Sequence, residues 1–323
     1  MSRTDRGFTL VEMLVVITII GILAGLTAAA AIAARNRARI AAISIELNSL
    51  DMAMKAYKEK FGEYPPDFSG LGGSAADQTA ARQAIVRHLM RVFPRYTRGA
   101  TWNDFVADVS NATTGWNVDP TKFGNQGPFF SIAFWLGGMP TFAQVTTGTV
   151  VSEFSGFSAD PTNPFNRSTS RISPILAEID LSRVSVDTGR GFGIRYWPTG
   201  AVGDVTTGTA PGAVVYFRAE NGVYRIDGTT GGNLKSVTDT DSTVVYPAGN
   251  TRIGFNGTSG SNSWINPRSF QILSSGMDVT YGSLTSSTTT YPGLAFPTGE
   301  NYSDRTFDDI TNFSNGTMED AIP

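Results

Sequence analysis

The chain contains no cysteine and a single histidine, His88, among its 323 residues. The lack of cysteine excludes a disulfide framework, a cysteine-ligated zinc site and a thiol nucleophile. With one histidine, a catalytic triad would have to pair His88 with a serine, and no Gly-x-Ser-x-Gly elbow, phosphate-binding loop or His-Glu-x-x-His helix is present. The sequence does not exclude a pair of catalytic carboxylates of the glycosidase kind, because such a pair is defined by its distance in the folded protein and not by its spacing along the chain. We therefore expect a protein that is not an enzyme, and we interpret His88 as a solvated or core-edge residue.

Charged residues are scarce as well, at 16% of the chain, and they sum to a net charge of -3. Glycine, serine and threonine take their place, which favours a loop-rich β fold over a helical bundle. There is no basic block beyond residue 39, so the sequence argues against nucleic-acid binding.

The longest apolar run covers residues 8–34, and its only formal charge is Glu12. As a helix the run is roughly 40 Å long, enough to cross a hydrocarbon core of about 30 Å. An ordinary secretory signal with a cleavage site in residues 27–34 is the alternative, but its apolar region would be much shorter. We expect residues 8–34 to span a membrane.

The helical pattern continues past this span. Apolar residues follow at alternating steps of three and four, which is one face of an amphipathic helix; they are Ile40, Ile43, Leu47, Leu50, Met54, Tyr57 and Phe61. Gly62, Pro65 and Pro66 then break the pattern. The sequence predicts one helix over residues 8–61, about 80 Å long, whose second half packs on the following domain.

The N-terminal stretch RGFTLVEMLVVITIIGILAGL resembles that of type IV pilins and of the pseudopilins of type II secretion systems. The resemblance implies that residues 1–7 are a leader and that a prepilin peptidase cuts between Gly7 and Phe8 and methylates Phe8. Glu12 then takes the family's acid position, the fifth residue of the mature chain. In a filament, Glu12 could pair with the new amine on Phe8 of a neighbouring subunit, since neither charge is easily buried alone. The alternative is an acid that reaches headgroup water at the membrane interface.

Residues 62–323 are expected to form an enlarged, antiparallel β-rich head on this helix, so that the fold class is α+β and pilin-like. Residues 75–97 read as a second helix, and the glycine-bounded run 127–138 as a buried helical turn or a core strand. Strands are predicted at 191–198, at 212–227 as a hairpin around AENG, and at 269–273.

The C-terminal region resembles the calcium site of the major pseudopilin, where a Gly-x-Asp turn and a later Asp-Ile-x-Asn segment enclose one Ca²⁺. The resemblance assigns the carboxylates to Asp278 and Asp309, with Leu273 as a carbonyl ligand. Because Ca²⁺ takes about six to eight oxygen ligands, Ser303, Asp304 or Asp308 would have to add to them. Ordinary surface turns are the alternative, since Asp and Asn favour turns.

The function that this resemblance implies is a non-enzymatic structural subunit of a type II secretion pseudopilus or a related type IV pilus-like filament. Its expected partners are the prepilin peptidase, other pilin or pseudopilin subunits and an inner-membrane assembly platform. The subunit would cross the inner membrane once, with its head in the periplasm or outside the cell. The sequence does not decide whether the chain is a major or a minor subunit of the filament.

The alternative is a membrane-anchored protein whose β-rich head binds a carbohydrate or surface polymer. That function would need exposed aromatic rings in a groove; the candidates are Trp116, Trp135, Trp197 and Trp264.

Overall fold

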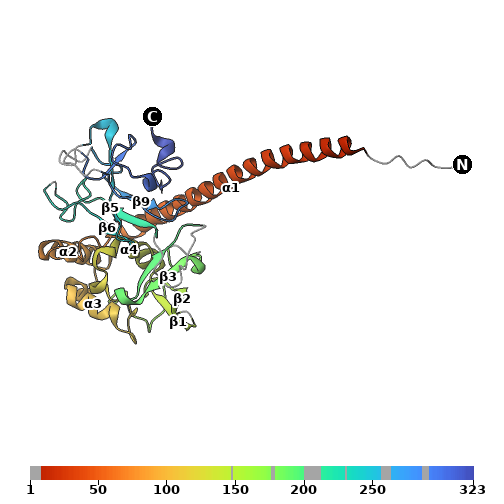
Figure 1. Ribbon diagram of the computed structural model, residues 1–323. Coiled ribbons are helices and arrows are strands. Elements are labelled where there is room, and N and C mark those ends of the chain that lie inside the picture. The colour runs from red at the N-terminus through yellow and green to blue at the C-terminus, as the bar shows by residue number, and fades with distance from the viewer. Residues whose placement is uncertain are drawn as a thin grey trace.

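A single long helix, α1, projects from the head and dominates the shape of the molecule (Figure 1). It runs without a break from Leu10 to Phe61, and Gly62 ends it in a left-handed conformation with φ 87° while its N–H donates to the carbonyl of Lys58. In this computed structural model, the described residues are 9–146, 148–175, 179–199, 212–229, 231–255, 263–285 and 291–323. The leader and Phe8 lie outside them.

The two halves of α1 have opposite surroundings. The predicted stripe lies in the core: Ile43, Leu47, Leu50, Met54 and Tyr57 are buried, and Ile40 and Phe61 pack against them in part. The first half stands free of the head (Figure 1). The prediction of one helix with an amphipathic second half is confirmed.

Three further α-helices belong to the head. They are α2, Ala75–Val92; α3, Trp102–Ser110; and α4, Gly127–Ile132, which continues as the π-helical turn η4, Ala133–Gly137. Ser74 caps α2 by accepting the N–H of Asp77, whose carboxylate accepts the Ser74 N–H in return. The second predicted helix is thus confirmed, and the run 127–138 is helical rather than a strand.

The strands are short and form several small sheets. They are β1, Pro140–Val145; β2, Gly148–Phe154; β3, Val184–Asp187; β4, Gly193–Tyr196; β5, Val215–Arg218; β6, Val237–Thr238; β7, Val244–Val245; β8, Ala248–Asn250; β9, Phe270–Ser274; β10, Leu294–Phe296; and β11, Ile310–Thr311. The antiparallel sheets are β1-β2, β3-β4, β6-β7 and β11-β9-β5, whereas β8 and β10 pair in parallel. The α+β class is confirmed, with a parallel pair that the sequence did not predict.

Short 3₁₀ turns connect these elements. They are η1, Thr97–Ala100; η2, Pro120–Lys122; η3, Gly124–Gln126; η5, Leu181–Arg183; η6, Thr188–Arg190; η8, Thr251–Ile253; η10, Asp304–Thr306; and η11, Glu319–Ala321.

The predicted hairpin in residues 212–227 is half right. β5 forms and the AENG turn closes with the Glu220 N–H donating to the Val223 carbonyl over 2.8 Å. The second arm contributes only isolated bridges, and β5 instead pairs with β9, 52 residues further on, in the register Val215↔Leu273. A non-local apolar strand therefore displaced the local partner, which a turn signal alone cannot reveal.

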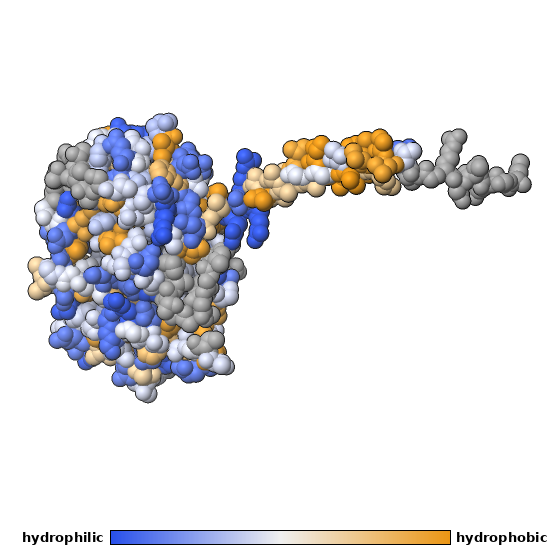
Figure 2. Space-filling model, in the orientation of Figure 1, coloured by the Kyte–Doolittle hydropathy of each residue, from blue (hydrophilic) through white to orange (hydrophobic). Residues whose placement is uncertain are grey.

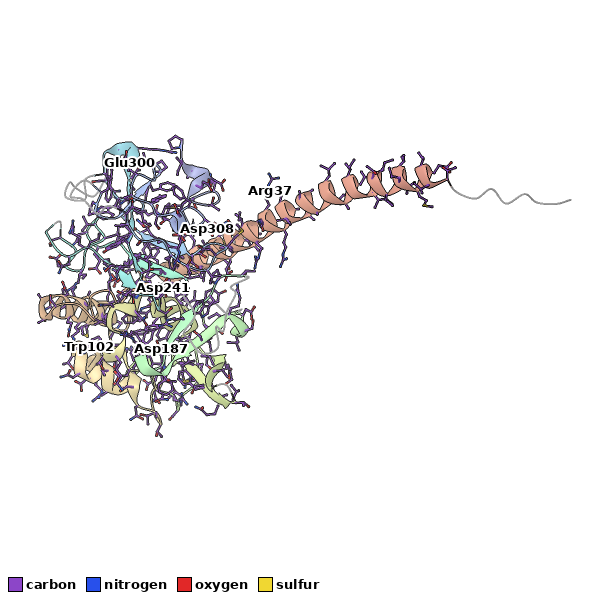
Figure 3. All side chains as sticks on the ribbon, in the orientation of Figure 1. Arg37, Trp102, Asp187, Asp241, Glu300 and Asp308 are labelled. Carbon is purple, nitrogen blue, oxygen red and sulfur yellow. The ribbon has the colours of Figure 1, made fainter. Side chains whose placement is uncertain are left out.

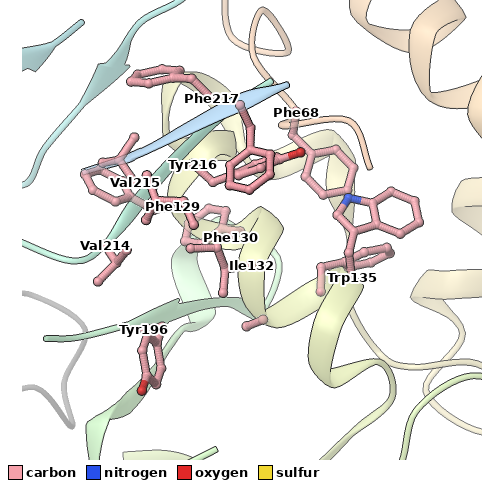
Figure 4. Packing of buried hydrophobic residues seen from close by; sticks show 14 of the residues in the cluster. Phe68, Phe129, Phe130, Ile132, Trp135, Tyr196, Val214, Val215, Tyr216 and Phe217 are labelled. Carbon is pink, nitrogen blue, oxygen red and sulfur yellow. The ribbon is translucent and has the colours of Figure 1, made fainter. Parts of the chain in front are cut away.

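The core is rich in aromatic residues (Figure 4). Helix α4 packs against both β4 and β5, with the ring of Phe130 against Gly193 of β4, while the ring of Phe68 stacks on Trp135 with centroids 5.6 Å apart. The Trp135 indole N–H donates to the carbonyl of Pro66 over 2.9 Å, so its polar end is satisfied in the interior. This packing ties the connector after α1 to the centre of the head.

His88 is buried at the edge of this core, so of the two expected placements, solvated or core-edge, the solvated one is wrong. Its Nε2 lies 2.9 Å from the Tyr57 hydroxyl on α1 and its Nδ1 lies 2.6 Å from Glu63. Burial lowers the pKa of His88 to about 4, against the opposing effect of Glu63. The imidazole is therefore neutral at pH 7 and joins α2 to the end of α1.

Because His88 binds a proton near pH 6.5 when unfolded and only near pH 4 when folded, acid should destabilise the head. We expect the free energy of unfolding to fall by about 2 kcal/mol between pH 7 and pH 5. Urea titration of the detergent-purified chain, followed by tryptophan fluorescence, measures this. His88→Gln should remove most of that difference; an unchanged pH dependence in the variant would contradict the assignment.

Candidate functional site

The N-terminal half of α1 exposes a continuous apolar surface (Figure 2). The exposed fractions of its large apolar side chains range from 45% at Val16 to 81% at Leu10. It is the one helix among the described residues that is long and apolar enough to cross a membrane. An apolar surface of this size needs lipid or other apolar helices around it.

Glu12 lies at the start of this helix and forms a capping box with Thr9. The Thr9 hydroxyl accepts the Glu12 N–H over 3.3 Å, and Glu12 Oε2 accepts both the N–H and the hydroxyl of Thr9 over 2.8 Å. The helix N-terminus favours a negative charge here. The pattern Thr-x-x-Glu before an apolar run is a sequence signal for this cap, and the sequence analysis missed it.

Gly7 and Phe8, the predicted processing residues, lie outside the described residues. Thr9 is the first residue described, so the proposed junction is next to the N-terminal end of α1.

A band of arginines separates the two halves of α1. Arg35 and Arg37 are exposed and Arg39 is partly so. Figure 2 shows them as a hydrophilic band where the helix leaves the head, and Figure 3 labels Arg37 there. Such cations fit the headgroup level at the end of a membrane span.

The structure brings together the two C-terminal segments that the sequence singled out. β11 pairs with β9, so that Thr311 lies opposite Leu273, and Gly276 turns the chain with φ 67° beside the Asp308 carbonyl. Asp308, labelled in Figure 3, accepts the N–H groups of Met277 and Asp278 over 2.8 and 3.1 Å.

The three predicted ligands differ in their surroundings. Asp309 is buried, and its Oδ1 has no hydrogen-bond partner. Burial, with the nearby charges of Asp308 and Asp278, raises the pKa of Asp309 well above its usual range. Asp278 is exposed and accepts the Thr280 N–H, while the Leu273 carbonyl accepts the hydroxyl of Tyr281 over 2.8 Å.

This region offers an incomplete set of cation ligands. An unpartnered buried carboxylate oxygen is what a bound cation would satisfy. Yet within the described residues no three His, Cys, Asp or Glu side chains are placed to hold a metal. Of the auxiliary candidates, Ser303 and Asp304 begin the η10 turn, and Asp308 is engaged as a cap.

The four tryptophans proposed for polymer binding are all buried, with exposed fractions of 2% or less. The remaining one, Trp102, is half-buried in an open groove between α2 and α3, with the guanidinium of Arg82 5.6 Å from its ring. Trp102 was not among the tryptophans expected to bind a polymer.

One comparison with known proteins gives a match. Residues 2–28 fit the family described as the prokaryotic N-terminal methylation motif. The search of curated proteins and the search of solved structures found no match. The matched segment contains the leader, the Gly7–Phe8 junction and Glu12, and it covers the exposed apolar part of α1 almost to its end.

Proposed function

Since the chain carries a prepilin-type methylation motif on a long apolar helix, and so fits the type IV pilin and pseudopilin family, we propose that it is a filament subunit of that kind. The motif supports processing by a prepilin peptidase and anchoring in a membrane by one N-terminal helix. The finer proposal is a structural subunit of a type II secretion pseudopilus or a related pilus-like filament, assembled from the inner membrane by a dedicated platform, with its head in the periplasm or outside the cell.

The observation that carries this proposal is the free apolar half of α1 with one acid at its start. In the membrane, lipid covers that surface; in a filament, the helices of neighbouring subunits would cover it. Glu12 would then pair with the Phe8 amine of a neighbour and fix the axial register between them.

A scaffold of this kind works through its surfaces, so we propose no enzymatic activity for the chain. The binding-protein alternative loses its main support, because the tryptophans on which it rested form part of the core.

Processing is the first test. The chain isolated from its native host should begin at Phe8 and carry one extra methyl group, as measured by the mass of the N-terminal peptide. A chain that begins near Ala34 would indicate an ordinary exported protein, and one that begins at Met1 or Ser2 a plain membrane anchor.

Assembly should depend on the charge of Glu12 and not on its capping role. Glu12→Gln keeps a carbonyl oxygen for Thr9 but removes the charge, whereas Thr9→Ala removes both hydrogen bonds of the capping hydroxyl and keeps the charge. We expect filaments to fall more than about tenfold for Glu12→Gln, because the neighbouring amine would be buried unpaired, and to persist for Thr9→Ala. Electron microscopy and sedimentation of sheared filaments measure both. Full assembly of Glu12→Gln would exclude the ion pair.

We also propose that the C-terminal region binds Ca²⁺ through Asp309 and Asp278, with the Leu273 carbonyl as a further ligand. The buried, unpartnered oxygen of Asp309 supports this, and the other ligands would have to come from nearby main-chain carbonyls, from water, or from Ser303, Asp304 or Asp308. A bound Ca²⁺ would also offset two of the three negative charges that Asp278, Asp308 and Asp309 can carry.

Millimolar Ca²⁺ should therefore raise the free energy of unfolding by about 2–3 kcal/mol in the detergent-purified chain, as an occupied site does. Mg²⁺ should have little effect, since it demands a smaller octahedral site. Asp309→Asn should abolish the response, whereas Glu300→Gln, a change at an exposed acid in the same third of the chain, should retain it. Equal melting curves with and without Ca²⁺ would mean that these segments are ordinary turns.

A further inference from the structure

A lysine, an aspartate and a glutamate meet in the interior of the head, far in sequence from one another. The ammonium nitrogen of Lys235 lies 2.9 Å from Asp67 Oδ2 and 3.3 Å from Glu220 Oε1. The side chains of Lys235 and Asp67 are 1% and 3% exposed, and that of Glu220 is 14% exposed. Asp67 follows α1, Glu220 follows β5, and Lys235 lies beside Tyr224, to whose carbonyl its N–H donates.

The backbone holds the Asp67 carboxyl group in place from both sides. The Ser69 N–H donates to Oδ1 over 3.1 Å, and the Arg218 N–H donates to Oδ2 over 2.7 Å. Phe68, the next residue, has φ 56°, a conformation that is costly for a bulky side chain. Its ring is fixed in the core against Trp135, as Figure 4 shows, so the strained backbone fixes the position of Asp67.

Lys235 and Asp67 are buried among apolar and polar side chains, whereas Glu220 also lines a more open cavity of about 160 Å³. Phe68, Ile85 and Ile226 line a cavity of about 10 Å³ together with the three ionisable groups, which is room for roughly one water molecule. Two carboxylates and one ammonium give this cluster a net negative charge, and burying charged groups costs desolvation free energy. A reaction that replaces the Lys235–Asp67 ion pair with a neutral group would remove most of that cost.

We propose that Lys235 and Asp67 form an intramolecular isopeptide bond, with Glu220 as the group that relays the proton. A bond forms between Lys235 Nζ and Asp67 Cγ, and the bond between Cγ and Oδ2 breaks. Of the three protons on the ammonium, one stays on the amide nitrogen and two pass to Oδ2, the first of them through Glu220 Oε1. Oδ2 leaves as water, so no oxidant, reductant or activated co-reactant is needed.

The geometry provides what such a condensation requires. The amine is held in contact with the carboxyl group, which makes the attack intramolecular. The N–H of Ser69 donates to Oδ1, the oxygen that carries negative charge in the tetrahedral intermediate and remains as the amide carbonyl. The cavity has room for the water that leaves, and the near-complete burial of the Lys235 and Asp67 side chains keeps bulk water away from the new amide.

The test is peptide mapping of the full chain purified in detergent. After tryptic digestion, mass spectrometry should find a branched peptide that joins the segments containing Asp67 and Lys235, lighter by one water than the two together. Trypsin should no longer cleave after Lys235. A free Asp67 peptide together with cleavage at Lys235 in the folded chain would overturn the proposal and leave an ordinary buried ion pair.

Two variants separate the bond from the ion pair. Lys235→Arg keeps the positive charge but cannot form the amide, so it should give no branched peptide. Glu220→Gln keeps both reacting groups and removes the proton relay, and we expect at least a tenfold lower yield of the branched peptide after the same time. Full yield in Glu220→Gln would show that Glu220 has no part in the reaction. None of these readouts depends on the N-terminus, so the filament proposal is tested separately.

Discussion

The structure depends on one helix that serves two environments. Residues of the first half of α1 expose apolar side chains all around, from Leu10 to Ile32, whereas the second half buries a single stripe from Ile43 to Tyr57 in the head. A continuous helix satisfies its own backbone hydrogen bonds in both surroundings, which no other single segment could do in lipid. Arg35, Arg37 and Arg39 lie between the two halves. The helix surface there is neither in the exposed apolar run nor in the buried stripe, so it can carry charged side chains.

The head is built to hold that helix without a disulfide. Polar contacts supplement the stripe near its start and in its middle. Glu46 Oε2 accepts the N–H and the hydroxyl of Thr199 and forms an ion pair with Arg183, and Asp51 accepts a hydrogen bond from the Asn312 side-chain amide. The glycine-, serine- and threonine-rich loops are ordered by aspartates that accept the N–H two residues further on, as at Asp119, Asp160 and Asp227. A low charge fraction therefore does not mean loose loops, since the few carboxylates are used as local caps.

The predictable parts of this molecule are those whose signal is local. The helical stripe, the stop at Gly62, the second helix from Ala75 and the strands at Gly193 and Phe270 follow from spacing and composition. The partners of the strands do not: β5 turns back at AENG and then pairs with β9, and β8 pairs in parallel with β10. The sequence could not decide between a solvated and a core-edge His88 for the same reason, because its partners Tyr57 and Glu63 lie on another helix and just beyond its end. In the C-terminal region, the resemblance to the major pseudopilin singled out two segments that the fold brings together, but only the fold shows that Asp308 is engaged as a cap and that Oδ1 of Asp309 has no partner.

The capping box at Thr9 changes how the acid at the start of α1 is understood. Both Thr9 donors go to the same carboxylate oxygen, Oε2, and Oε1 accepts no hydrogen bond from the residues that the structure describes. A carboxylate that is already hydrogen-bonded and placed at a helix N-terminus is less costly to hold near lipid than a bare one. The cap therefore orients the Glu12 carboxylate at the start of α1, and Oε1 is the oxygen that the proposed ion pair with a neighbouring chain would use. Capping and the proposed filament pairing would then not compete for this side chain, since each needs a different oxygen.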